Sequence, residues 1–292
     1  MTAPTPSYHP SPSRPKLRLP PGACDTHFHI FGPQSVYPLA PDRSYTPADA
    51  PREKLFALHA MLGIERGVIV QSGSHGFDNT VVVDAIAAKP ASYTGIALVR
   101  TSISDKDLQQ LNAKGICGAR FHYMKHLGAG PSIDDVVAFS KRLAPLGWHL
   151  QIHLESTLIA EMMPKLKQSA VPVVIDHMGR LDASLGIDQA PFRHLRELLR
   201  DDRFLVKVSC CERASRKGAP YADAVPFARA LVSEFGDRTL WGTDWPHPNV
   251  TGGIPDDGLL VDLLSEIAPT AAERQRLLVD NPAKFYRFPR QA

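Results

Sequence analysis

The chain is poor in cysteine, with four among 292 residues, and no two of them have the spacing of a zinc or redox Cys-x-x-Cys pair. We therefore expect Cys24, Cys117, Cys210 and Cys211 to be reduced structural thiols. The first twenty residues contain six prolines but no apolar run that suits a signal peptide or a membrane span. These absences predict a cytoplasmic protein with no membrane partner.

Runs of like charge are also missing. The chain has 33 Lys and Arg residues against 30 Asp and Glu residues, and its net charge is +3. A nucleic-acid partner is therefore not expected, and an anionic substrate would have to be bound by individual arginines. No internal repeat or low-complexity tract follows the first twenty residues.

The sequence does contain a regular alternation of two kinds of segment: short apolar runs rich in residues that favour β-strands, and segments whose apolar residues recur at helical spacing. Strands are predicted at 23–31, 67–71, 93–99, 117–122, 148–154, 171–176, 204–210 and 239–243. Helices are predicted at 52–62, 78–88, 104–113, 133–143, 156–167, 190–199, 224–235, 259–267 and 271–279. This repetition predicts an α/β fold, a single (β/α)8 TIM-type barrel at 21–292, after a flexible proline-rich arm at 1–20.

Histidines and an aspartate stand where four of the predicted strands end. His27 and His29 lie two residues apart, so both side chains leave the same face of a strand. His153 ends the fifth strand, His177 ends the sixth, and Asp244 follows the eighth. The carboxyl ends of barrel strands meet on one rim. These five residues predict a divalent metal site, with zinc as the expected ion and manganese as the alternative.

Structural roles are the alternative for these residues. A His-x-His strand end is also typical of a half-buried strand with polar tips, and Thr-Asp-Trp-Pro around Asp244 also suits a turn or a helix N-cap. The convergence of four segments favours chemistry. Asp244 and His177 are then the candidate catalytic residues, and Asp244 is suited to take a proton from water and return it to a leaving oxygen.

Three arginines are expected on the same rim. Arg120 closes the fourth predicted strand, Arg180 follows the sixth, and Arg213 follows the seventh. A guanidinium binds carboxylates or sulfonates through paired hydrogen bonds, although each residue taken alone also suits a surface salt bridge. Their common position predicts an anion pocket. Further candidates for substrate contact lie in the loops after the strands: Tyr45, Ser74, His75, Lys125, His126 and His247.

The chain resembles the amidohydrolase superfamily, in particular its amidohydrolase 2 branch, in five segments: 21–27, 70–76, 175–180, 241–248 and 254–258. Within that branch these segments are similar to those of the 2-pyrone-4,6-dicarboxylate lactonases and the 4-sulfomuconolactone hydrolases. The resemblance implies a hydrolase that opens the ring of a small anionic lactone in bacterial degradation of aromatic compounds. It also implies water activated by a divalent metal, with an aspartate as general base and then general acid.

Two positions depart from the pyrone lactonases. That group has a tyrosine in place of His153 and is regarded as working without a metal, and an arginine expected in the strand-four loop is replaced by His126. Both departures favour a metal-bearing lactonase. The same branch implies two rival functions, a metal-dependent decarboxylase of a carboxylated ring and a sugar-acid lactone isomerase. A barrel that only binds is the remaining alternative, and no feature predicts the oligomeric state.

Overall fold

All eight predicted strands are present in the computed structural model, which describes residues 8–250, 253–286 and 288. Each strand pairs in parallel with the next one along the chain, so the single (β/α)8 barrel is confirmed. The strands are β1 (Cys24–Phe28), β2 (Arg66–Val70), β3 (Tyr93–Leu98), β4 (Ile116–Tyr123), β5 (His149–Leu154), β6 (Val173–Ile175), β7 (Phe204–Lys207) and β8 (Thr239–Leu240).

The barrel closes where the chain after β8 meets β1. Thr26 N–H donates to Trp241 O at 2.9 Å, and Asp244 N–H donates to His27 O at 2.8 Å. β8 ends at Leu240, earlier than predicted, and Asp244 has a φ of 61°, outside the strand region. This irregular closure places Asp244 directly beside His27, at the carboxyl end of the barrel.

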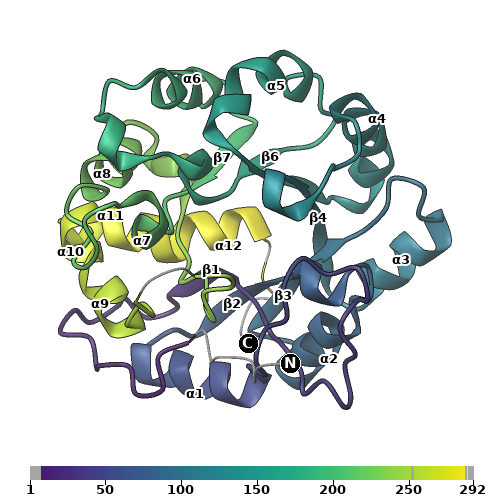
Figure 1. Cartoon of the computed structure of the whole chain (residues 1–292), viewed down its shortest axis with the longest axis horizontal. Coiled ribbons are helices and arrows are strands. Elements are labelled where there is room, and N and C mark those ends of the chain that lie inside the picture. Colours follow the sequence, from purple (N-terminus) through teal and green to yellow (C-terminus); the bar gives the residue numbers. More distant parts are fainter. Residues whose placement is uncertain (1–7, 251–252, 287, 289–292) are drawn as a thin grey trace.

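Helices surround the sheet, as Figure 1 shows. The α-helices are α1 (Arg52–Leu62), α2 (Thr80–Ala88), α3 (Asp105–Ala113), α4 (Ile133–Leu143), α5 (Ile159–Leu166), α6 (Ala190–Leu198), α7 (Cys211–Ala214), α8 (Val225–Glu234), α9 (Asp257–Asp262), α10 (Leu264–Ile267), α11 (Ala271–Gln275) and α12 (Asn281–Tyr286). Short turns of other helix types are η1 (Gly73–His75), η2 (Lys125–Leu127), η3 (Ala144–Leu146), η4 (Ser156–Leu158), η5 (His177–Arg180), η6 (Ala183–Leu185), η7 (Gly236–Arg238) and η8 (Arg276–Asp280).

The predicted helices agree with these elements, apart from their ends. The segment predicted at 259–267 forms two helices, α9 and α10. α7 and α12 were not predicted, because a helix of four residues shows no hydrophobic period and Pro282 signals a helix end. No helix among the described residues combines the length and apolarity that crossing a membrane requires.

The predicted N-terminal arm is described only from residue 8 onward. Residues 8–20 form no regular element, and Ser13 N–H donates to the Asp256 carboxylate at 3.0 Å. Leu17 and Leu19 are partly buried against the core. This part of the arm therefore lies along the barrel beside α9, and the flexibility of the arm stays a prediction.

Candidate active site

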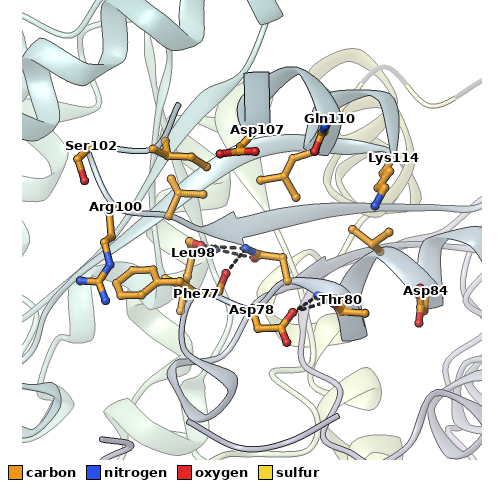
Figure 2. Close-up of a pocket in the computed structure, with 15 residues that line it drawn as sticks. Phe77, Asp78, Thr80, Asp84, Leu98, Arg100, Ser102, Asp107, Gln110 and Lys114 are labelled. Carbon is orange, nitrogen blue, oxygen red and sulfur yellow. Dashed lines mark hydrogen bonds between the residues drawn. The ribbon is translucent and has the colours of Figure 1, made fainter. Parts of the chain in front are cut away.

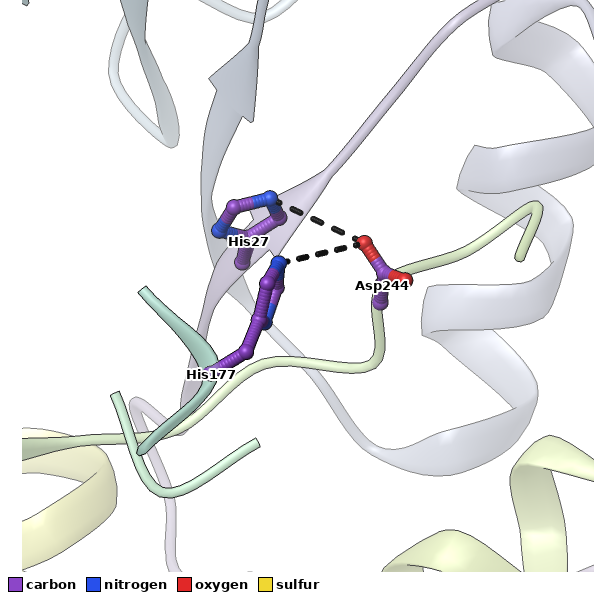
Figure 3. A group of neighbouring side chains, drawn as sticks. All are labelled: His27, His177 and Asp244. Carbon is purple, nitrogen blue, oxygen red and sulfur yellow. Dashed lines mark ion pairs between the residues drawn. The ribbon is translucent and has the colours of Figure 1, made fainter. Parts of the chain in front are cut away.

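Two histidines and an aspartate meet at the carboxyl end of the barrel (Figure 3). His27 lies on β1, His177 begins η5 after β6, and Asp244 follows β8. His27 Nε2 and His177 Nε2 each lie 3.7 Å from Asp244 Oδ1. All three side chains are buried, and their ligand atoms lie within 4.8 Å of one another. The structure thus brings together three of the five residues predicted for a metal site.

His29, which directly follows β1, also lies beside Asp244. Its Nδ1 lies 2.7 Å from Val70 O, and because a carbonyl only accepts, Nδ1 carries the hydrogen. In the neutral ring, Nε2 then has a free lone pair, and it faces Asp244 Oδ1 at 3.4 Å. Two acceptors at this separation repel each other unless a cation lies between them. The donor set therefore requires a proton or a metal ion here.

The same atoms fit a divalent metal ion. Zinc binds imidazole nitrogen and carboxylate oxygen at roughly 2.0–2.2 Å, so two ligands of a tetrahedral site lie about 3.4 Å apart. The distances from Asp244 Oδ1 to the three Nε2 atoms, 3.4, 3.7 and 3.7 Å, are close to this value. His27 Nε2 is also buried without a hydrogen-bond partner. His27, His177 and Asp244 would therefore hold the ion that the family resemblance implies, and His29 Nε2 faces the same carboxylate oxygen.

Burial and neighbouring charges set the protonation states that metal binding needs. Burial lowers the pKa of His177 to about 3, and burial together with the Lys207 charge holds the pKa of His27 well below its usual value. Burial acts to raise the pKa of Asp244, but the Arg213 guanidinium outweighs it and holds this pKa well below its usual range. These two imidazoles are thus neutral and the carboxylate is ionised near pH 7.

His153 occupies a different position, at the end of β5. Its Nδ1 lies 3.1 Å from Nδ1 of His122 on β4, and its ring packs against His177 with centroids 5.5 Å apart. One Nδ1 must donate and the other accept, so the neutral pair offers one bare Nε2 and one Nε2–H. Both Nε2 atoms are buried and have no partner among the described residues. His153 thus lines the site beside the group of His27, His177 and Asp244, and its role as a metal ligand stays a prediction.

The three predicted arginines differ in their partners. Arg120 lies within β4, inside the barrel, and its Nε donates to Asp176 Oδ2 at 2.8 Å. Arg213 lies in α7 and donates through Nε to Asp244 Oδ2 at 2.8 Å and through Nη2 to Pro248 O at 2.8 Å, with Nη2 2.7 Å from the same carboxylate oxygen. Arg180 is half-buried at the end of η5 and makes no hydrogen bond or ion pair with a described residue. The guanidinium that remains free for an anion is therefore that of Arg180.

Three predicted contact residues lie on the β1 and β2 side of the site. The rings of Tyr45 and His75 pack against Phe31, with centroids 6.4 and 6.1 Å apart, and Phe31 stacks on His29. Ser74 is buried in η1 next to His75. Burial raises the pKa of Tyr45 to about 12, so its hydroxyl stays protonated and can donate.

Two further predicted residues lie on the opposite side, in η2 after β4. Lys125 and His126 are both exposed, and Lys125 Nζ lies 3.8 Å from Glu155. Partial burial and the Arg180 guanidinium lower the pKa of His126. His126 follows β4 and Arg180 follows β6, so both lie in loops at the carboxyl end of the barrel.

His247 is fully buried, and its ring pairs with Asp257 rather than with the group of His27, His177 and Asp244. Its Nε2 lies 3.1 Å from Asp257 Oδ1 at the start of α9, and its N–H donates to Asp244 O at 2.7 Å. Burial opposes the imidazolium form, but Asp257 outweighs it and raises the pKa of His247. His247 thus links α9 to the turn that carries Asp244.

A charged network that was not predicted from the sequence lies beneath the site. Lys207 of β7 is fully buried and donates to Thr26 O at 2.9 Å and to Gln151 Oε1 at 2.8 Å, and its Nζ lies 3.1 Å from His27 Nδ1. Asp176 Oδ1 lies 3.3 Å from the same Nδ1. Burial lowers the pKa of Lys207 to about 8. The available signal was a lysine within an apolar strand.

His122 was also missed, although it lies two residues after Arg120 and so on the same face of β4. A second group of potential metal ligands consists of Cys210, Glu212 and Asp244. Arg213 already occupies Asp244 Oδ2 at 2.7 Å, and a guanidinium there opposes a second cation. This second group is therefore a poorer candidate for a metal site than the group of His27, His177 and Asp244.

A separate groove lies between α2 and α3 and is also lined by residues of the loops that follow β2 and β3 (Figure 2). Polar groups there already bond to their neighbours: Thr80 Oγ1 donates to Asp78 Oδ1 at 2.6 Å, and Asn79 Nδ2 donates to Leu98 O at 3.0 Å. No imidazole or thiol lines it. This groove therefore adds nothing to the chemistry of the site.

Known proteins resemble this chain over nearly its whole length. A 2-pyrone-4,6-dicarboxylate hydrolase of Comamonas testosteroni is 44% identical over 288 residues, which is 96% of this chain and 94% of that protein. A 4-sulfomuconolactone hydrolase of Hydrogenophaga intermedia is 38% identical over 286 residues, 96% of this chain and 93% of that protein.

The fold has a match in a crystal structure with citric acid bound, described as a probable 2-pyrone-4,6-dicarboxylic acid hydrolase from Acinetobacter baumannii. Its TM-score is 0.82 at 26% identity, over 91% of this chain and all of that one. The sequence profile of the amidohydrolase family matches residues 24–288. The profile match and the geometry of the site agree. The chain belongs to the amidohydrolase family.

Proposed function

We propose that this chain is a hydrolase that opens the ring of a small anionic lactone, with a divalent metal ion held by His27, His29, His177 and Asp244. The observation that carries the proposal is the facing pair of acceptors, His29 Nε2 and Asp244 Oδ1, 3.4 Å apart beside two neutral imidazoles. The relatives at 44% and 38% identity bear the names of lactone hydrolases, which supports the choice of reaction.

Asp244 takes the acid–base role. As an ionised carboxylate it accepts a proton from the attacking water and returns it to the ring oxygen that departs, so the products are one carboxylate and one hydroxyl group. Arg213 holds Oδ2 at 2.7 Å and leaves Oδ1 toward the imidazoles. A divalent ion, when bound, supplies Lewis-acid polarisation of the lactone carbonyl and acidifies water. Zinc suits this nitrogen and oxygen donor set, and manganese is the alternative.

Arg180 provides the main contact for an acidic substituent of the substrate. Its guanidinium is the one of the three predicted arginines without a carboxylate partner among the described residues, and it lies near His126. The His122 and His153 pair offers a donor and an acceptor to a neutral polar group of the ring. Substrates of the 4-sulfomuconolactone and 2-pyrone-4,6-dicarboxylate type, from aromatic-compound degradation in the cytoplasm, match these features.

The test is a ring-opening assay on purified protein of known metal content. Activity on both anionic lactones is measured as isolated, after chelation, and after addition of zinc or manganese. We expect chelation to remove activity and one of the two ions to restore it. Product analysis separates the reactions, because a hydrolase yields the ring-opened acid whereas a decarboxylase releases carbon dioxide.

Two outcomes would overturn the proposal in different ways. Full activity in protein with less than roughly one metal ion per ten chains would leave only an acid–base mechanism. Carbon dioxide release, or isomerisation of a sugar-acid lactone without hydrolysis, would replace the reaction itself.

A further inference from the structure

We propose that residues 8–17 of the N-terminal arm form a strap that positions the turn at 243–248, which carries Asp244, for catalysis. Two separate contacts fix the turn, one through Tyr8 and one through α9. The kinetic consequence of this strap rests on the proposed function. Its structural consequence, the ordering of the turn, does not.

The turn at 243–248 contains residues in an uncommon backbone conformation. Asp244 and His247 have φ values of 61° and 57°, in the left-handed region that costs a non-glycine residue about 1–3 kcal/mol. Such a conformation persists only when surrounding contacts hold it. On the barrel side, His29 N–H donates to Trp245 O at 2.7 Å. The outer side needs contacts of its own.

Tyr8 supplies the first outer contact. Its ring packs on Trp245 with centroids 5.3 Å apart and an interplanar angle of 40°. Trp245 directly follows Asp244 and is 2% exposed. Removal of the Tyr8 ring would open one side of this indole to water and release one constraint on the turn.

The second outer contact passes through α9, which the strap holds at both ends. Ser13 N–H donates to Asp256 Oδ1, the N-cap of α9, at 3.0 Å. Lys16 N–H and Leu17 N–H donate to Asp262 Oδ1, at the last residue of α9, at 2.7 and 2.8 Å. Hydrogen bonds from N–H groups to carboxylates are among the stronger ones in proteins.

Helix α9 connects the strap to the turn that carries Asp244. Its first residue, Asp257, lies 3.1 Å from His247 Nε2, and both side chains are buried. His247 N–H donates to Asp244 O at 2.7 Å. The strap, α9, Asp257 and His247 thus form one continuous set of contacts that ends at the catalytic aspartate.

Gly258 offers a clean way to displace the strap. A Cβ at this position would overlap Ser13 O and lie 2.7 Å from the Ser13 carbonyl carbon. Alanine favours a helix over glycine, so Gly258→Ala does not weaken α9 itself. Gly253→Ala is the matched control, because its Cβ would meet no heavy atom of the described residues within 4 Å.

Two further changes separate the contacts. Tyr8→Ala removes the ring against Trp245 and leaves the bonds to α9 in place. Asp262→Ala removes the acceptor for the two N–H groups, whereas Asp262→Asn keeps an oxygen that can accept them. We expect the asparagine variant to resemble the wild type and the alanine variant to resemble Gly258→Ala.

The measurements are amide hydrogen exchange at 13–17 and 243–248, tryptophan fluorescence, and kcat and KM on the anionic lactone. Gly258→Ala should speed exchange in both segments and lower kcat roughly tenfold with little change in KM, since a misplacement of about 1 Å costs up to a hundredfold. Unchanged exchange at 13–17 in that variant, or a released arm with wild-type exchange at 243–248 and wild-type kcat, would overturn the strap. If the wild type opens no lactone, the proposed function fails, and exchange and fluorescence alone decide the strap.

Discussion

Replacement of Arg180 by methionine should convert the enzyme from one that selects anionic lactones into one that does not. Methionine keeps much of the apolar stem and removes the charged fork. Arg180 has no carboxylate partner among the described residues, so its loss leaves no buried charge unpaired. A charge-assisted contact is worth about 1.5–3 kcal/mol. At about 1.4 kcal/mol per factor of ten, kcat/KM on an anionic lactone should fall by a factor of between about ten and somewhat more than a hundred.

Arg213→Met and Arg120→Met are the matched controls, since each removes a guanidinium of the same size. Arg213 pairs with Asp244 at 2.7 Å and Arg120 pairs with Asp176 at 2.8 Å, and these pairs are largely buried. Breaking a buried pair costs about 3–5 kcal/mol of stability, so both controls should unfold at a lower temperature. Their activity should fall on charged and neutral lactones alike.

The assay compares kcat/KM on 2-pyrone-4,6-dicarboxylate, 4-sulfomuconolactone and an uncharged lactone of similar size. In Arg180→Met the efficiency should fall on the two anions and stay within about twofold on the neutral lactone. Equal losses on all three substrates, or no loss on any, would refute the assignment of Arg180 as the anion contact.

Three further changes test other parts of the structure. Asp244→Asn should keep the fold and lose at least about a hundredfold in kcat, because an amide cannot accept a proton from water; near wild-type turnover would show that another group is the base. Asp257 raises the pKa of His247, so this pair stabilises the fold fully below the ordinary histidine pKa of about 6.5, and the stabilisation is lost as pH rises through the raised pKa. In denaturant titrations, Asp257→Asn should therefore lower the free energy of unfolding more at about pH 5.5 than at about pH 8.5. An equal loss at both pH values would contradict this linkage. Gly242→Ala places a Cβ 2.5 Å from His27 N and 2.7 Å from Asp25 Oδ1, so thermal unfolding should show a loss of about 1–3 kcal/mol, and an unchanged Tm would mean that β1 can move aside.

Local patterns in the sequence were enough to predict the barrel. Strand periodicity and helical period are properties of short segments, and their repetition leaves few topologies. α1 and α4 begin and end at the predicted residues. The same logic placed His27, His177 and Asp244 on one rim, because every barrel strand ends there.

The partners of the charged residues could not be predicted in this way. Arg120 and Asp176 are 56 residues apart, and Asp176 follows β6, which is separated from β4 by the single strand β5. Periodicity tells which face a side chain leaves, and it does not tell which carboxylate across the barrel meets it. Of the three arginines predicted for the anion pocket, Arg120 and Arg213 pair with carboxylates and Arg180 has no such partner among the described residues, so the pocket itself stays a prediction.

The N-terminal arm shows the same limit most clearly. Its prolines and lack of hydrophobic period indicated only an irregular segment, yet Leu17 N–H bonds to a carboxylate 245 residues away. The sequence by itself thus determined the elements, their order and the rim on which the chemistry lies. The ionised state of Asp244, the tautomer of His29 and the docking of the arm depend on contacts between segments distant in the chain, and only the tertiary structure brings those segments together.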